Sequence, residues 1–158
     1  KVIQSGHKAI NVLNAVVYED VSNNLSDEFF RKARIATGNF QNLFKFKRML
    51  WPPWTGVGFS FLSHKVLRWL TPVFIIISFA LVISLSFNNM FYFLLFLCYS
   101  LVILLPVLDI ILKKLKINNI FLRFITHFFT MNLALLFGMF RAMKGVKSNV
   151  WKPTKRNQ

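Results

Sequence analysis

Hydrophobic and polar residues follow two different patterns along this chain. From residue 28 to 45, polar and apolar side chains recur at steps of three and four, which is the spacing of one helix with two faces. From Trp69 to Leu108, forty consecutive residues carry no formal charge, and the polar pair Asn88-Asn89 lies near the middle. One membrane span needs about 20 apolar residues. The pattern therefore predicts an amphipathic helix followed by two spans joined by a very short turn.

The amphipathic helix carries a basic stripe that contains a glycine. A glycine in a helix interior costs about 1 kcal/mol relative to alanine, so its position indicates that something approaches the backbone closely. With arginines on the same face, an anionic ligand is the natural candidate. The alternative is a solvated basic face that touches lipid headgroups. We expect Ser26 to be the N-cap. The stripe is formed by Arg31, Arg34, Gly38, Gln41 and Lys45.

A second amphipathic segment lies between this helix and the spans. The sequence Trp51-Pro52-Pro53-Trp54 should break the first helix, and Trp51 could border the entrance for a substrate or anchor the loop in the membrane interface. Phe59 to Leu70 then places apolar and basic residues on opposite sides, as in helices that lie in the interface. The spans should follow at about Leu70 to Phe87 and Phe91 to Leu112, where Asp109 can pair with Lys113 one turn on.

A third apolar stretch, Phe124 to Phe140, has two readings. Its seventeen residues contain His127 and Asn132, and it either crosses the membrane or lies re-entrant or interfacial. Lysines follow the second span while the turn between the spans has none, so both outer ends of the hairpin are expected in the cytoplasm. If the third stretch crosses, the basic tail ends outside, against the charge rule. The re-entrant reading is therefore favoured.

The first twenty residues have the pattern of the end of an α/β unit. A helix should end at Gly6, a strand should cover Ala9 to Tyr18, and Glu19-Asp20 should form a turn. So short a piece cannot bury a core alone, and we expect the rest of its sheet upstream. The fold class is thus a mainly α membrane protein with the C-terminal remnant of an α/β domain. Its expected parts are the remnant at 1–50, a loop and interface helix at 51–69, a transmembrane hairpin at 70–112, the third apolar segment at 113–143 and a basic tail at 144–158.

Composition and charge support a membrane protein and argue against nucleic-acid binding. The chain is 55% hydrophobic and contains 19 phenylalanines, which is too apolar for a soluble domain of 158 residues. Its net charge is +15, but the basic residues cluster beside the apolar runs, where anionic headgroups attract them. A single cysteine and three histidines without ligand spacing give no reason to expect a metal site.

Three spaced motifs and the tail resemble a known family. They resemble the C-terminal half of membrane-bound family-2 glycosyltransferases, the polysaccharide-synthase-like enzymes related to cellulose and hyaluronan synthases. The resemblance covers nearly the whole chain. The motifs are Ala15-x-x-x-Glu19, Glu28-x-x-Arg31-Lys32-x-Arg34-x-x-x-Gly38-x-x-Gln41, Ser63-His64-Lys65-x-x-Arg68-Trp69 and the tail Trp151-Lys-Pro-Thr154-Lys-Arg156.

The resemblance implies a function and a site. In the synthases the helix carries Gln-x-x-Arg-Trp, where the arginine lies near the nucleotide diphosphate and the tryptophan helps to stack the acceptor sugar. Here Arg34 stands at the arginine, whereas Arg31 and Ile35 depart from the pattern, which puts acceptor stacking and processive synthesis in doubt. The resemblance makes Arg31, Arg34, Gly38 and Gln41 the expected residues on the diphosphate and acceptor side, with Trp51 at an acceptor entrance.

The rest of the expected enzyme lies outside this chain. In the family, upstream aspartates, including an Asp-x-Asp motif, bind the nucleotide and Mg²⁺ or Mn²⁺, and a further aspartate is the base, so no catalytic residue is expected here. The implied parent has a GT-A-like α/β domain on the cytoplasmic side of a bacterial inner membrane. It uses a nucleotide-sugar donor and a glycan or lipid-linked acceptor in cell-envelope glycan biosynthesis, with inversion. The alternative is a small non-enzymatic membrane scaffold or regulatory subunit with a basic cytoplasmic face.

Overall fold

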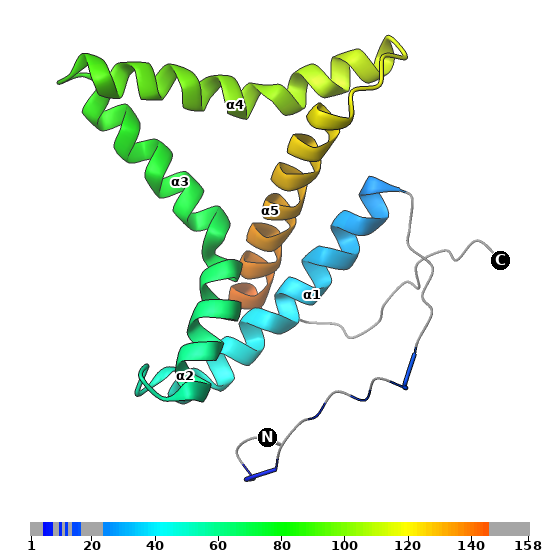
Figure 1. Cartoon of the computed structure of the whole chain (residues 1–158), viewed down its shortest axis with the longest axis vertical. Coiled ribbons are helices and arrows are strands. Elements are labelled where there is room, and N and C mark those ends of the chain that lie inside the picture. The colour runs from blue at the N-terminus through cyan, green and yellow to red at the C-terminus, as the bar shows by residue number, and fades with distance from the viewer. Residues whose placement is uncertain (1–4, 8–9, 11, 13, 17–23, 146–158) are drawn as a thin grey trace.

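The computed structural model describes residues 5–7, 10, 12, 14–16 and 24–145, and all regular structure within them is helical. Five α-helices are joined by short connections, with one 3₁₀ turn and one π-helical segment (Figure 1). In chain order the elements are α1 (Leu25–Lys45), η1 (Lys47–Leu50, 3₁₀), α2 (Gly56–Phe61), η2 (Leu62–Val66, π), α3 (Leu67–Ser86), α4 (Met90–Lys114) and α5 (Ile120–Lys144).

The N-terminal expectation of a strand is not confirmed. Of the predicted strand 9–18, only residues 10, 12 and 14–16 are described, and these lie in no strand. The acidic pair Glu19-Asp20 and the tail from residue 146 onward lie outside the described part of the chain. The α/β remnant therefore stays a prediction, while the described part of the chain is mainly α-helical, as expected.

The start of α1 corrects the expected cap. The N-cap is Asn24, whose side chain accepts a hydrogen bond from the backbone N–H of Ser26 at 3.1 Å, so the assignment of Ser26 as N-cap was wrong. Asparagine and serine serve equally well at this position, and the sequence alone does not separate them. Asp27 and Glu28 lie in the first turn and Lys45 in the last, as the helix dipole favours.

Three helical segments are long and apolar enough to cross a membrane: Gly56–Ser86, Met90–Lys114 and Ile120–Lys144. The two expected spans correspond to α3 and α4. The predicted interface segment is not separate from the first span, because α2, η2 and α3 form one continuous helix. The third apolar stretch is a single helix, α5, which extends four residues beyond each predicted end.

Helices α3 and α4 form a hairpin held by polar and aromatic contacts. A hydrogen bond of 2.8 Å joins Ser78 Oγ and Tyr99 Oη, and the ring of Phe79 stacks on Tyr99 at 5.3 Å and on Phe96 at 6.1 Å between centroids. Polar contacts of this kind between membrane helices contribute about 1 kcal/mol each. The hairpin is open at its outer ends, and α3, α4 and α5 trace a triangle in which α5 lies opposite the turn (Figure 1).

Helix α1 lies alongside α5 and packs on it more extensively than any other pair of elements (Figure 1). The contact uses small residues, which let two helix backbones approach closely. A Cβ added to Gly138 would lie 2.5 Å from the Cβ of Ala36 and 2.7 Å from the carbonyl oxygen of Ala33. Phe29 and Phe137 extend the interface, with ring centroids 6.2 Å apart. The buried residues of α1 are Ala33, Ala36, Thr37 and Phe40.

Gly38 in α1 and Gly138 in α5 make a matched pair for testing this packing. Gly138→Ala places a methyl group against the backbone of α1, and such overpacking costs about 1 to 3 kcal/mol. Gly38→Ala adds the same methyl group where nothing lies within 4 Å, and it gains helix propensity of about 0.5 to 1 kcal/mol. We expect the thermal unfolding midpoint of the chain in detergent to fall for the first variant and to stay or rise for the second. Equal shifts would show that Gly138 is not a tight contact.

Candidate functional site

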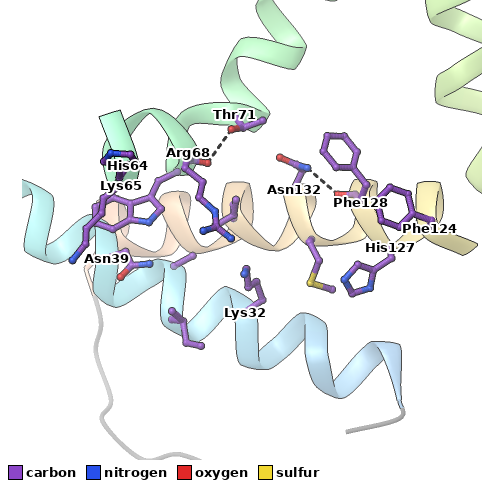
Figure 2. A pocket seen from close by; sticks show the side chains of 15 residues that line it. Lys32, Asn39, His64, Lys65, Arg68, Thr71, Phe124, His127, Phe128 and Asn132 are labelled. Carbon is purple, nitrogen blue, oxygen red and sulfur yellow. Dashed lines mark hydrogen bonds between the residues drawn. The ribbon is translucent and has the colours of Figure 1, made fainter. Parts of the chain in front are cut away.

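The first cavity lies between α1, the η2–α3 segment and α5, and has a volume of about 630 Å³ (Figure 2). Elements that are far apart in the sequence each supply one wall. Helix α1 contributes Lys32, Ile35, Ala36 and Asn39; η2 and α3 contribute His64, Lys65, Arg68, Trp69 and Thr71; α5 contributes Phe124, His127, Phe128, Met131, Asn132 and Leu135. The basic residues of the lining thus come from α1 and the η2–α3 segment, while α5 supplies most of the apolar residues together with His127 and Asn132.

A π-helical turn places the basic residues of η2 at the cavity. The backbone N–H of Leu67 bonds to the carbonyl of Leu62, five residues earlier, so this turn holds one residue more than an α-helical turn. His64 and Lys65 lie inside the turn, and Arg68 follows it. Turns of this kind inside α-helices are frequently found at functional sites. The extra residue rotates the side chains before the turn relative to those after it.

The charge of the first cavity is one-sided. Lys32, Lys65 and Arg68 line it, and no aspartate or glutamate does. Figure 2 shows Arg68 reaching from α3 and Lys32 from α1 into the same space. Two cations that face a shared cavity repel each other unless an anion lies between them. The geometry therefore favours a negatively charged ligand.

The side-chain oxygen of Asn132 is a hydrogen-bond acceptor without a donor among the described residues. Its side chain is 9% exposed, and its Nδ2 donates to the carbonyl of Phe128 at 2.8 Å. Its Oδ1 is buried and accepts no hydrogen bond from the described residues. In Figure 2 this oxygen is turned toward the Thr71 side of the cavity. Buried polar atoms without partners are uncommon, and they frequently mark places where a ligand or water binds.

A second cavity of about 650 Å³ lies where the start of α1 meets the end of α4 and the start of α5. Its formal charges balance, because Glu28, Asp109, Lys113 and Arg123 all line it. Within the described chain no ion pair joins Asp109 to Lys113, so the expected pairing of these two residues was wrong. Asp109 is instead 9% exposed at the cavity wall.

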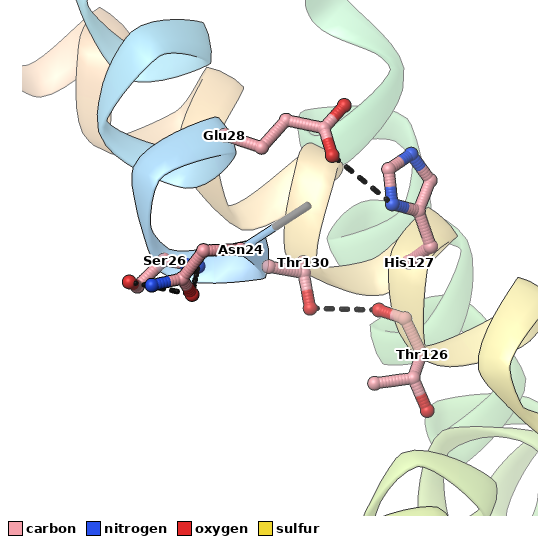
Figure 3. A network of polar contacts seen from close by, with 6 residues as sticks. All are labelled: Asn24, Ser26, Glu28, Thr126, His127 and Thr130. Atoms are coloured by element: carbon pink, nitrogen blue, oxygen red, sulfur yellow. Dashed lines mark hydrogen bonds and ion pairs between the residues drawn. The ribbon is translucent and has the colours of Figure 1, made fainter. Parts of the chain in front are cut away.

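His127 lines both cavities and connects α5 to α1. Its Nδ1 lies 3.8 Å from Oε2 of Glu28, and the two side chains are 45% and 33% exposed (Figure 3). Such an exposed pair, which needs a protonated histidine, contributes at most about 1 kcal/mol. Nearby, the hydroxyl of Thr130 donates to the carbonyl of Thr126, while the hydroxyl of Thr126 is buried without a described partner. This end of α5 is polar although the helix as a whole is apolar.

The residues predicted for the diphosphate side lie on the other flank of α1. At 100° per residue, Arg31, Arg34, Gly38 and Gln41 lie on one side of the buried face, and Lys32, Ile35 and Asn39 lie on the other. None of the four predicted residues lines either of the two cavities described above. Arg31 and Arg34 are half-buried and Gln41 is exposed. The structure thus leaves their predicted role untested.

Gly38 and Trp51 have open surroundings. Nothing lies within 4 Å of a Cβ built at Gly38, so the α1 backbone is accessible on the arginine flank. Trp51 is 74% exposed, and its ring meets that of Trp54 edge to face at 5.8 Å between centroids. The two rings form an exposed aromatic pair in the loop before α2. Trp51 does not line either described cavity.

Sequence reasoning missed the cavity flank of α1. Glu28, Lys32, Ile35 and Asn39 recur at steps of four, three and four, so a second stripe at helical spacing was visible in the sequence. The arginine stripe differs from it in containing a helix-interior glycine, Gly38. Which stripe faces the spans depends on the α1–α5 contact, and that contact joins residues about 100 positions apart. His127 and Asn132 were recognised as unusual polar residues, and both line the first cavity.

Comparisons with protein-family models, with curated proteins and with solved structures find no match to this chain.

Proposed function

We propose that this chain is the C-terminal portion of a membrane-bound family-2 glycosyltransferase. The parent protein would transfer a sugar from a nucleotide-sugar donor to a glycan or lipid-linked acceptor, with inversion, in cell-envelope glycan biosynthesis. The observation that supports this proposal most is that the two helical segments on which the sequence resemblance depends lie at one cavity. Segment 28–41, through Lys32 of its motif and through Ile35, and segment 63–69, through His64, Lys65, Arg68 and Trp69, both line the first cavity (Figure 2).

The residues present indicate which steps of the reaction this part of the parent protein would support. Arg31 and Arg34 would hold the departing diphosphate through charge-assisted hydrogen bonds, on a flank where Gly38 leaves the backbone accessible. The parent's upstream α/β domain would supply the base and the aspartates that bind Mg²⁺ or Mn²⁺. Ile35, which stands where the synthases have their acceptor-stacking tryptophan, lines the first cavity, so we assign that cavity to the acceptor side. Without an aromatic ring there, we do not expect processive synthesis.

For the membrane arrangement we propose that α5 lies in the interface and does not cross. Helix α1 carries six charged residues, and charges are costly in hydrocarbon, so α1 stays outside the bilayer core. The tight contact at Gly138 holds α5 at the same depth as α1. The triangle of Figure 1 agrees, because α5 joins the two outer ends of the α3–α4 hairpin. Those ends carry Lys65, Arg68, Lys113 and Lys114, which favours the cytoplasmic face of a bacterial inner membrane.

Cysteine labelling tests this arrangement. In a Cys98→Ser background, Asn88→Cys reports on the hairpin turn, Asn118→Cys on the start of α5 and Lys144→Cys on its end. An interfacial α5 predicts that positions 118 and 144 react with a membrane-impermeant maleimide from one side and position 88 from the other. If positions 88 and 144 react together and 118 does not, α5 crosses the membrane.

The transferase proposal is tested on the full-length parent protein in native membranes. Its reading frame should contain an Asp-x-Asp motif and a later acidic base upstream of this chain. We expect Arg34→Ala to lower the release of nucleoside diphosphate from the nucleotide-sugar by about 100-fold, because the leaving group loses a charged donor. Membrane retention, followed by immunoblot, should not change.

Arg48→Ala is the matched control, since Arg48 is an exposed arginine in η1 that lines neither described cavity. It should keep the parent's activity. Full activity of the Arg34 variant would exclude the diphosphate role. Parallel loss of activity and membrane retention would point to the scaffold reading, in which the arginine stripe contacts lipid.

A further inference from the structure

The first cavity combines two features, a cluster of cations and a mainly apolar wall. It holds the unopposed cations Lys32, Lys65 and Arg68, and none of them forms an ion pair with a described residue. Its α5 wall is mainly apolar, with Phe124, Phe128 and Leu135, and also contains His127 and Asn132. An occupant that satisfies both walls must carry negative charge at one end and hydrocarbon at the other.

The depth of the cavity agrees with a membrane-derived occupant. Arg68, Trp69 and Thr71 lie in the first turns of α3, where the apolar span begins. Basic residues and tryptophan at the end of a span typically lie at the level of the lipid headgroups. Trp69 is fixed there by its ring contacts with Phe40 and Phe61, at 6.2 and 6.0 Å between centroids. The phosphate of a membrane lipid would therefore reach Lys65 and Arg68 while staying in the headgroup layer.

Asn132 indicates that the headgroup also carries a hydrogen-bond donor. Its buried Oδ1 lacks a partner among the described residues, and a phosphate group has only acceptors to offer when ionised. A headgroup hydroxyl or amine next to the phosphate would satisfy this oxygen.

We propose that the cavity between α1, η2–α3 and α5 binds the headgroup of an anionic membrane phospholipid. Lys65, Arg68 and Lys32 contact its phosphate, and the Oδ1 of Asn132 accepts a hydrogen bond from its hydroxyl group. The acyl chain lies along α5. This is the cavity assigned above to the acceptor side, but the lipid site does not rest on that assignment, because the lipid binds whether or not the parent transfers sugar to it.

Lipid binding is measured on the purified full chain, delipidated in a neutral detergent, by native mass spectrometry. The probes are dioleoyl phosphatidylglycerol, dioleoyl phosphatidylcholine, dioleoylglycerol and inorganic phosphate. We expect phosphatidylglycerol to bind more tightly than the other three. Lys65→Gln and Arg68→Gln should each weaken it about fivefold, which corresponds to about 1 kcal/mol for each cation near the headgroup layer.

Lys114→Gln is the matched control, because Lys114 is an exposed cation at the end of α4 that lines neither described cavity. It should leave phosphatidylglycerol binding unchanged. The proposal is overturned if the Lys65 and Arg68 variants bind this lipid as the wild type does, or if all three variants lose it equally. It is also overturned if inorganic phosphate alone binds at Arg68 and the lipid does not, since the cavity would then be a site for free anions. Because only binding is measured, a failed transferase assay of the parent leaves the result intact.

Discussion

The close approach of α1 and α5 at Gly138 determines how the charged and apolar parts of this chain meet. Helix α1 is too highly charged to enter a bilayer, whereas α5 is apolar enough to cross one. Packing through Ala33, Ala36 and Gly138 joins them backbone to backbone. The first cavity and the polar end of α5 both lie beside this contact, so each depends on its geometry.

The sequence was sufficient for the elements that rest on local pattern. The uncharged run from Trp69 to Leu108 gave the hairpin, and helical spacing gave α1 with its charged ends. It was insufficient where two alternatives are locally equal. Asn24 and Ser26 are both good caps, and Pro72 near the start of the first span does not end the helix, so η2 continues into α3. Only tertiary contact decides such cases.

The candidate site shows the same limit. The amphipathic pattern of α1 contains two polar stripes, and periodicity alone does not say which one faces the membrane helices. Contact with α5 directs Lys32 and Asn39 toward the first cavity and leaves the Arg31 and Arg34 flank facing away from it. The two flanks therefore have different surroundings. One lines the first cavity beside α3, and on the other a Cβ built at Gly38 would have nothing within 4 Å.

Locking α1 to α5 also has a mechanical consequence. Helix α5 touches both α3 and α4, near the outer ends of the hairpin, so α1 and α5 form the rigid base of a triangle whose other two sides are joined by a short turn. A rotation of α1 would therefore change the angle between the hairpin arms. The charged helix α1 would then be coupled mechanically, through α5, to both apolar arms of the hairpin.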